Sequence, residues 1–226
     1  QKAPALLDVV QDLIDRGRAT FVLTGSSARK LRRGAAVNLL PGRVAAFRLD
    51  PFSLREVPAP DVQERLLYGS LPGMLAVPDL SDRELDLASY VTTYLEEEVR
   101  AEALVRQVGD FARFLEWAAS ESGNIVNLRK LSQEIGVSHT TIGAYYRILE
   151  DCLIAERIEP LTHSKTRKKL TKSEKYLFFD LGVRRMAARE GTKPPRETMG
   201  RLFEQFVGLE LVRGAHAARR RLTIRF

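Results

Sequence analysis

Leu128-Arg-Lys-Leu-Ser-Gln-Glu-Ile-Gly-Val-Ser-His-Thr-Thr-Ile-Gly-Ala-Tyr-Tyr-Arg-Ile-Leu149 has the apolar spacing of two short helices that meet at a tight turn. Apolar residues recur every three or four positions on both sides of Gly136, and the small residue Ser132 stands where the two helices would touch. Ser138 is of the residue type that caps a helix N-terminus, here that of the second helix. This pattern is typical of a helix-turn-helix, and we expect one at this place.

The residues after this motif predict the wing of a winged helix. Residues 152–158 alternate like a strand, and residues 161–175 would form the wing. The outward face of the second predicted helix has few groups that could read bases, so contact with nucleic acid would be mainly to phosphates. The candidate nucleic-acid contacts are His139, Thr140 and Arg147 on the helix and Lys165, Arg167, Lys168, Lys169 and Lys172 in the wing.

Residues 59–122, which precede the motif, predict a helical subdomain. Val62–Tyr68 has helical spacing and ends at Gly69, and a longer helix is expected from Asp82 to Val105. Glutamates 96–98 would point in different directions on that helix, which favours a solvated face or an interdomain salt link over a metal site. The apolar residues of 111–117 have the spacing of a helix that packs into a core.

Nearer the N-terminus, the short apolar run Phe21–Leu23 stops on Thr24-Gly25-Ser26-Ser27. Residues 5–14 before it have helical spacing. The run predicts a buried strand of a parallel sheet, whose carboxyl end would present the hydroxyls of Thr24 and Ser26. No Gly-x-x-x-x-Gly-Lys-Ser/Thr sequence, the loop that cradles nucleotide phosphates, occurs in the 226 residues.

Several stretches, taken in order, resemble prokaryotic AAA-type P-loop ATPases that carry a C-terminal nuclease-like domain of unknown function of the DUF 4143 type. The resemblance covers most of the chain. It rests on Leu23–Leu31, Leu39–Arg43, Pro51–Glu56, Tyr68–Gly73, Tyr90–Glu98 and Gly200–Val207.

The resemblance implies the chemistry of an ATPase that uses ATP and Mg²⁺. Thr24 and Ser26 would act as sensor hydroxyls near the terminal phosphate, and Arg43 would stabilise phosphate charge within or between subunits. It also implies that the chain begins just after the acidic Walker B pair. We therefore expect the longer parent protein to be the ATPase, and these 226 residues alone to bind ATP neither tightly nor productively.

The C-terminal residues 176–226 would then be the start of the nuclease-like domain. Lys175–Gly182 reads as a strand that runs into a turn, and residues 202–212 read as a helix packed through Phe203, Phe206, Val207 and Leu211. Glu204 on this helix is expected to have a structural or charge-pairing role, because the further metal-binding acids of such nucleases do not follow it in this sequence.

Composition agrees with more than one unit, because 226 residues with 44% hydrophobic content exceed an average domain. The single cysteine, Cys152, is expected to pack in the core. No apolar run is long enough to span a membrane, and we expect a cytoplasmic protein. Residues 1–150 hold 18 Lys+Arg against 20 Asp+Glu, a net charge of −2, whereas residues 151–226 hold 18 against 9, a net charge of +9. Such an imbalance is compatible with a polyanionic partner.

Together these features predict α/β and mainly α parts: a partial P-loop ATPase sheet (1–58), a helical subdomain (59–122), a winged helix-turn-helix (123–175) and an incomplete nuclease-like unit (176–226). The predicted function is that of an AAA-type ATPase that couples nucleotide state to a C-terminal half of the protein facing nucleic acid or a partner. The candidate partners are nucleic acid and further copies of the same chain. The alternative is a non-enzymatic DNA-binding or adaptor protein.

Overall fold

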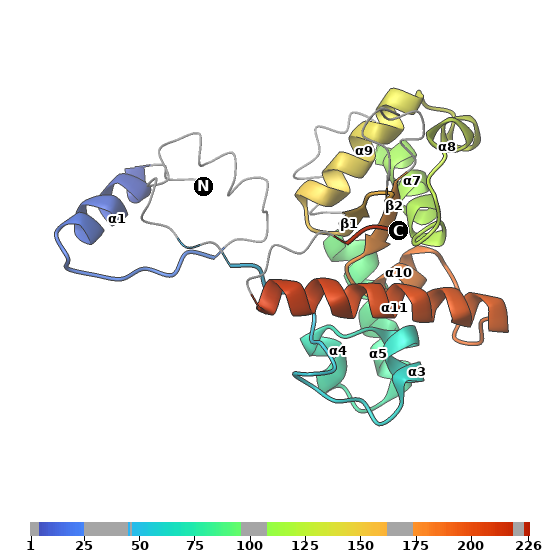
Figure 1. Cartoon of the computed structure of the whole chain (residues 1–226), viewed down its shortest axis with the longest axis horizontal. Coiled ribbons are helices and arrows are strands. Elements are labelled where there is room, and N and C mark those ends of the chain that lie inside the picture. The colour runs from blue at the N-terminus through green and yellow to red at the C-terminus, as the bar shows by residue number, and fades with distance from the viewer. Residues whose placement is uncertain (1–4, 25–44, 46, 96–107, 162–173, 219–223) are drawn as a thin grey trace.

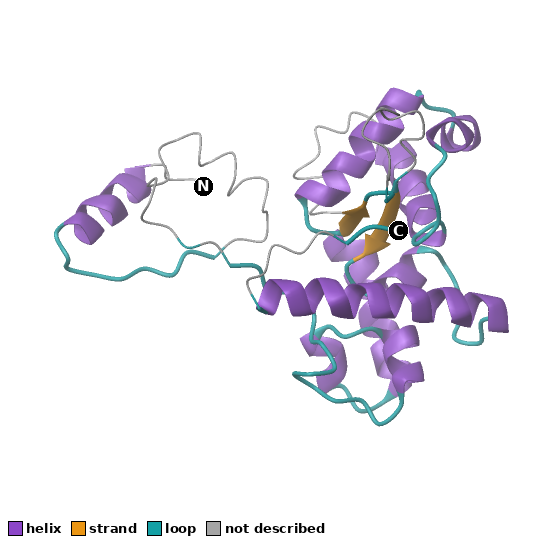
Figure 2. Ribbon diagram, viewed as in Figure 1, coloured by secondary structure: helices purple, strands orange, loops and turns teal. Residues whose placement is uncertain are grey.

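The structure, a computed structural model, describes residues 5–24, 45, 47–95, 108–161, 174–218 and 224–226. These residues are mostly helical and include one small antiparallel sheet (Figures 1 and 2), which agrees with an α plus β class. The elements are α1 (Ala5–Asp15), α3 (Val62–Tyr68), α4 (Pro72–Ala76), α5 (Leu80–Ser89), the π-helix η1 (Tyr90–Leu95), α7 (Val108–Ser120), α8 (Leu128–Ile135), α9 (His139–Asp151), β1 (Ala155–Ile158), β2 (Lys175–Phe178), α10 (Leu181–Ala187) and α11 (Arg196–Ala217).

The helices α8 and α9 begin and end where their sequence predicts. The side chain of Asn127 accepts hydrogen bonds from two backbone N–H groups of the first turn of α8. Gly136 ends α8 at φ 82°, a left-handed conformation that glycine adopts without strain. Ser138 caps α9 by accepting from the Thr141 N–H at 3.1 Å. The turn between the helices is closed by Ser132, whose hydroxyl donates to the carbonyl of Val137 at 2.5 Å.

The strands β1 and β2 pair antiparallel, with Ala155 opposite Phe178 and Ile158 opposite Lys175. Both outer edges of this pair are partly covered: Ile125 bridges to Lys175, and Glu159 bridges to Arg225. The expected wing lies mainly in residues 162–173, which are outside the described residues. The hydrogen bonds of β2 with β1 cross the domain boundary predicted between residues 175 and 176.

The core has two parts. The larger is built on aromatic side chains of α7, α9 and β2, among which the rings of Tyr146 and Tyr176 stack with centroids 4.2 Å apart. Phe111, Phe114 and Leu115 of α7 are buried in it, as the sequence predicted. Cys152 packs against it, half-buried. The smaller part lies between α3, the strands, α10 and α11.

The expected long helix from Asp82 to Val105 is formed differently. α5 begins at Leu80, and from Tyr90 to Leu95 the chain continues as a π-helix. The helix starts two residues earlier because Asp79 caps it, accepting from the N–H groups of Ser81 and Asp82. Residues 96–107, with the three glutamates, are outside the described residues.

The buried strand predicted at Phe21–Leu23 is not formed in this structure. Residues 20–24 have no regular secondary structure, and Val22 is 88% exposed. A buried parallel strand requires hydrogen-bonded neighbours and covering helices. The strands present in the described residues, β1 and β2, pair with each other instead. The predicted helix α1 is present, and it lies apart from the helical body (Figure 1).

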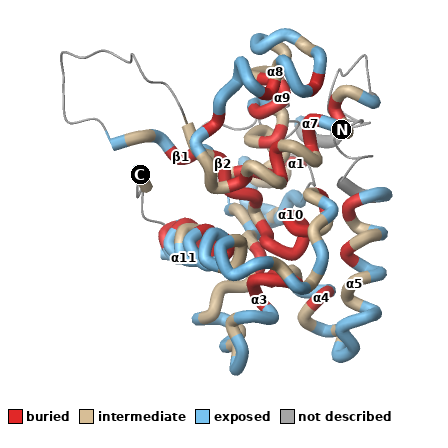
Figure 3. The backbone as a smooth tube through the Cα atoms, turned by 90° about the vertical axis from the view of Figure 1, so that its right-hand side faces the viewer, coloured by how far each residue is buried: buried red, intermediate tan, exposed pale blue. Residues whose placement is uncertain are grey.

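The packed face predicted for α11 is also wrong. Of its four predicted members only Phe206 is buried, while Phe203, Val207 and Leu211 are 52%, 44% and 58% exposed. The helix itself carries apolar residues on several of its sides, so the sequence alone does not show which side is buried. The contacts select another face, on which Leu202, Phe206 and Leu209 pack beside Leu66, Leu177 and Leu181. In Figure 3, where α11 is seen nearly end-on, buried, intermediate and exposed positions lie around the helix.

Candidate functional site

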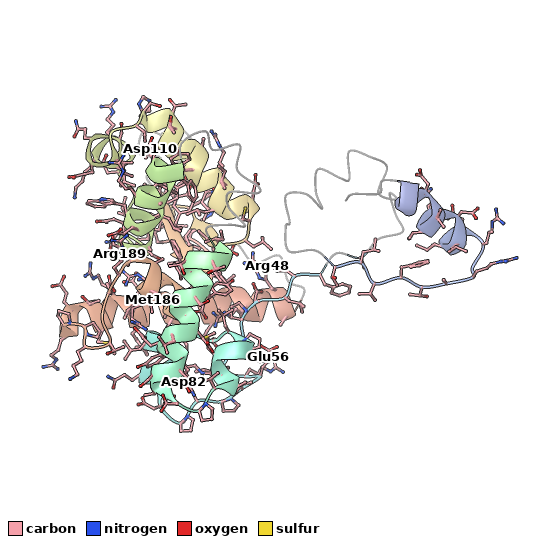
Figure 4. All side chains as sticks on the ribbon, turned by 180° about the vertical axis from the view of Figure 1, so that it is seen from behind. Arg48, Glu56, Asp82, Asp110, Met186 and Arg189 are labelled. Carbon is pink, nitrogen blue, oxygen red and sulfur yellow. The ribbon has the colours of Figure 1, made fainter. Side chains whose placement is uncertain are left out.

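Residues 48–56 attach the N-terminal segment to the helical body, and we call this attachment the clasp. Arg48, labelled in Figure 4, lies where the extended N-terminal segment reaches the body. Its guanidinium donates to Asp50 through Nε at 2.8 Å and forms an ion pair with Glu156 of β1. The other carboxylate oxygen of Asp50 lies 2.7 Å from Nδ1 of His216, in the last turn of α11. Two elements distant in sequence thus hold Arg48 and Asp50.

The clasp continues with backbone hydrogen bonds. The Leu54 N–H donates to the Glu210 carboxylate at 2.9 Å, and the Arg213 guanidinium donates to the carbonyl of Phe52 at 3.2 Å. The Phe52 N–H donates to the carbonyl of Ser70 at 3.0 Å. Glu210, Arg213 and His216 all come from the C-terminal half of α11. This half of the helix therefore serves as the surface on which the clasp lies.

Glu56, also labelled in Figure 4, closes the clasp on itself. Its carboxylate accepts from the Ser53 N–H at 2.9 Å and from the Ser53 hydroxyl at 2.8 Å. These hydrogen bonds favour the ionised form and lower the pKa of Glu56. The clasp is thus a turn with its own internal hydrogen bonds as well as external ones.

A cavity of about 290 Å³ lies beside the clasp, between β1 and the C-terminal half of α11. His216 and Glu156 line this cavity and also contact the clasp, through Asp50 and Arg48 respectively. The lining consists of Glu156, Arg157, Ile158, Glu159, Val212, Ala215, His216 and Ile224.

A second cluster of buried polar contacts, centred on Asp180, connects the end of α3 to the start of α10, and we call this cluster the α10 joint. Asp180 is fully buried, caps α10 by accepting from the Val183 N–H at 3.1 Å, and accepts from the Ser70 N–H at 2.6 Å. Burial raises the pKa of Asp180, although these N–H groups and Arg213 act in the opposite direction. Neither glycine of this joint has room for a side chain: a Cβ on Gly69 would meet the Asp180 carboxylate, and one on Gly182 would lie 2.4 Å from the Tyr68 backbone.

Buried arginines extend the joint to neighbouring helices. Arg185 donates to the carbonyl of Leu67 at 2.7 Å and forms an ion pair with Glu84 of α5. Arg184 donates to the carbonyl of Ala119 at the end of α7 at 2.7 Å and pairs with Glu190. Because these cations lie in a protein interior, the carbonyls and carboxylates around them offset the cost of their desolvation.

The candidate nucleic-acid residues of α9 are exposed. His139 and Thr140 lie in the first turn, and Arg147 lies two turns further along the same side as Thr140. Gly143 and Ala144 between them are half-buried. The remaining candidates, Lys165, Arg167, Lys168, Lys169 and Lys172, are outside the described residues.

The residues that the structure describes do not fit an ATP and Mg²⁺ site. Thr24 is exposed in a segment without regular structure, and Ser26 and Arg43 are outside the described residues. Within the described ranges no group of three or more His, Cys, Asp or Glu residues is arranged to hold a metal ion. Nor does any helix in those ranges combine the length and apolarity that crossing a membrane requires.

Two known families match the chain, and the boundary between the two matched regions lies near the clasp. Residues 1–58 match a family described as an AAA domain, so the N-terminal part is similar to AAA-type ATPases. Residues 59–193, more than half of the chain, match a domain of unknown function, DUF8612. The chain belongs to the DUF8612 family. The expected AAA-type resemblance is thus supported, whereas the family that matches the helical body is DUF8612 and not the DUF 4143 type. The DUF8612 match shows no nuclease domain. No curated protein and no solved structure matches the chain.

Sequence reasoning missed the two clusters that define the described part of the DUF8612 protein. Pro51–Glu56 was recognised only as part of a resemblance, and the role of His216 has no local signal, because its partner Asp50 is 166 residues away. Asp180 could have been identified, since Asp followed by Leu-Gly at the end of a strand is a helix N-cap signal. Glu204 pairs with Lys175 at 3.3 Å, as expected.

Proposed function

We propose that the chain is part of a cytoplasmic AAA-type ATPase in which the clasp transmits movement of the AAA-like residues 1–58 to the helical DUF8612 body. In this proposal Thr24 and Ser26 are sensor hydroxyls, and Arg43 acts on phosphate. The ATP and Mg²⁺ chemistry belongs to the full-length protein. The residues described here would receive and pass on the movement.

The observation that carries this proposal is the set of contacts that α11 makes with residues 50–54. A flexible linker would have few such contacts, whereas here side chains of Glu210, Arg213 and His216 each bind the segment. Arg213 also donates to the carbonyl of Phe179, beside the α10 joint, at 2.9 Å. A displacement of the clasp would therefore act on α11 and on the start of α10 together.

The test is ATP hydrolysis by the full-length protein carrying Glu210→Gln. This change removes the charge that accepts the Leu54 N–H and leaves the AAA-like residues untouched. We expect it to change turnover by about threefold or more, the scale of a coupling free energy below 1 kcal/mol. The control is Glu197→Gln, an exposed glutamate in the first turn of the same helix. Absence of any ATPase activity in the full-length protein would refute the proposal. Equal turnover of the Glu210→Gln and Glu197→Gln variants would show that the clasp does not transmit the movement.

A second candidate function is contact with nucleic acid through α8 and α9. The observation that favours it is the exposed side of α9 from Thr140 to Arg147, together with exposed Arg129 and Lys130 on α8. The half-buried Gly143 and Ala144 would let the helix backbone approach a duplex closely. The few base-reading groups favour binding to phosphates with little sequence preference.

Fluorescence anisotropy with two unrelated duplexes over a salt series tests this function. We expect weak binding that falls by orders of magnitude between about 50 and 200 mM salt, if about six or more phosphates are neutralised. Replacing Arg167, Lys168 and Lys169 together by Ala should lower the salt slope by about three for both duplexes. Failure to bind at low salt would favour the role of an adaptor between domains.

A further inference from the structure

The exposed side of α11 carries a row of apolar side chains. Phe203, Val207 and Leu211 follow one another at intervals of four residues, so they lie on one face of the helix. Each leaves about half of its surface accessible: 52%, 44% and 58%. The rest of α11 is well anchored, because Leu202, Phe206 and Leu209 on the opposite face are buried. The row is therefore held on a rigid support.

The row is symmetric about Val207 as far as seven residues on either side. Equal steps before and after this residue meet side chains of similar size: large apolar ones at four residues and glycines at seven. Steps of four, seven and eleven residues return to about the same angle on a helix with 3.6 residues per turn. The exposed positions of the row are Arg196, Gly200, Phe203, Val207, Leu211, Gly214 and Ala218.

We propose that this face binds the same face of a second copy of the chain, as an antiparallel pair of α11 helices with a two-fold axis at Val207. Such an isologous contact places Val207 against Val207 of the partner subunit and Phe203 against Leu211 of the partner subunit. Gly200 would face Gly214 of the partner subunit, and the absence of side chains there lets the helix ends approach.

Charge also favours the antiparallel copy. Arg196, in the first turn of α11, would lie at the C-terminal end of the partner helix, where the last carbonyl groups carry partial negative charge. The two helix dipoles are opposed in this arrangement, which is the favourable orientation. Glu204 lies at the flank of the row, opposite Glu210 of the partner subunit, and each carboxylate has a cation of its own chain, Lys175 at 3.3 Å and Arg213 at 3.3 Å.

The size of this face indicates a weak, reversible dimer. The 22 residues of α11 span about 33 Å at 1.5 Å per residue. One helix face of that length is smaller than the roughly 800 Å² per partner of a standard interface, so we expect dissociation in the micromolar range or above.

Sedimentation velocity on the 226-residue chain, from about 1 to 200 µM, tests the proposal in the concentration range expected for a small interface. We expect a monomer–dimer equilibrium that Val207→Glu weakens by about tenfold or more, because the two-fold axis sets the two new charges face to face. The matched control is Leu85→Glu, a change of another exposed apolar residue on α5, which should leave the equilibrium unchanged. A wild-type chain that stays monomeric throughout, or a dimer that Val207→Glu leaves intact, overturns the proposal.

A mixing experiment keeps the test decisive if Val207→Glu also affects folding. Val207→Glu and Val207→Lys chains should each remain mainly monomeric, and their equimolar mixture should form a one-to-one dimer, since the opposite charges meet at the axis. Circular dichroism of each variant alone verifies that both are folded. A mixture of folded variants that remains monomeric would show that Val207 does not lie at a two-fold axis. These readouts do not involve nucleotide, so they stand or fall separately from the proposed ATPase role.

Discussion

The helices α10 and α11 are neighbours in the chain and differ in how they use their residues. α10 has seven residues, of which six are buried, including Arg184 and Arg185. α11 has 22 residues and buries seven, while Phe203, Val207 and Leu211 remain exposed. The short helix thus buries two charged side chains, whereas the long helix leaves three large apolar side chains exposed.

This difference shows that available partners, and not polarity alone, decide what is buried. Arg185 can be fully buried because the Leu67 carbonyl and the Glu84 carboxylate meet its guanidinium, whose central carbon lies over the Tyr68 ring, 5.4 Å from the ring centroid. The exposed residues of α11 are apolar, and the described part of the chain supplies no element to cover them. The following predictions test that distinction, from the largest expected effect to the smallest.

Asp180→Ala should cost the most, because it leaves the buried N–H groups of Ser70 and Val183 without an acceptor and opens a cavity. We expect the free energy of unfolding to fall by about 3–5 kcal/mol. Urea unfolding followed by circular dichroism measures it, with Asp86→Ala, an exposed aspartate of α5, as the control. A loss below about 1 kcal/mol would mean that the joint contributes little to the fold.

Two leucines of α11, two residues apart in sequence, lie on different faces of the helix and allow the buried and exposed faces to be compared. Leu209 is 2% exposed and Leu211 is 58% exposed. Leu209→Ala should lower the free energy of unfolding by about 2–5 kcal/mol, whereas Leu211→Ala should change it by no more than about 0.5 kcal/mol. Thermal unfolding of dilute samples, in which dimers are absent, compares the two. Similar losses in both variants would contradict the assignment of the faces.

Two glycines make a comparable pair. A Cβ at Gly182 would lie 2.4 Å from the Tyr68 backbone, whereas nothing lies within 4 Å of one at Gly200. Gly182→Ala should destabilise the protein by about 1–3 kcal/mol through overpacking. Gly200→Ala should stabilise it by about 0.5–1 kcal/mol, since alanine is the better helix former. If the urea midpoints of both variants moved in the same direction relative to the wild type, the proposed difference in packing at the two glycines would be refuted.

The pH dependence of stability should also reflect the joint. Burial raises the pKa of Asp180 above its ordinary value of 3.8, so the folded state retains this proton to a higher pH than the unfolded chain. The free energy of unfolding should therefore decrease as the pH rises from about 3.8 towards the folded pKa, and then level off. The slope from this group is at most about 1.4 kcal/mol per pH unit. Urea unfolding measured from acidic to neutral pH should show this decrease in the wild type but not in Asp180→Asn. Identical pH profiles of the two proteins would contradict the role of Asp180.

Local features of the fold could be predicted from the sequence. The end of α3 at Gly69, the cap of α9 at Ser138 and the strand from Lys175 follow from residue types within one or two turns. The buried face of α11 and the clasp could not be predicted in this way. Both depend on contacts between residues more than 100 positions apart, such as Leu54 with Glu210. The strand expected at Phe21–Leu23 failed for a related reason, because a strand is stabilised by neighbours that its own sequence does not specify.

The contact between Ser70 and Asp180 has a consequence for synthesis of the chain on the ribosome. Asp180 is translated 110 residues after Ser70. At about 5–20 residues per second, the end of α3 waits on the order of 5 to 20 s for the aspartate that completes its surroundings. During that interval Leu66, which packs against residues of α10 and α11 in the finished protein, has no core to enter. The nascent chain thus leaves the apolar surface of α3 uncovered until α10 and α11 have been translated, and exposed apolar surface of this kind favours aggregation.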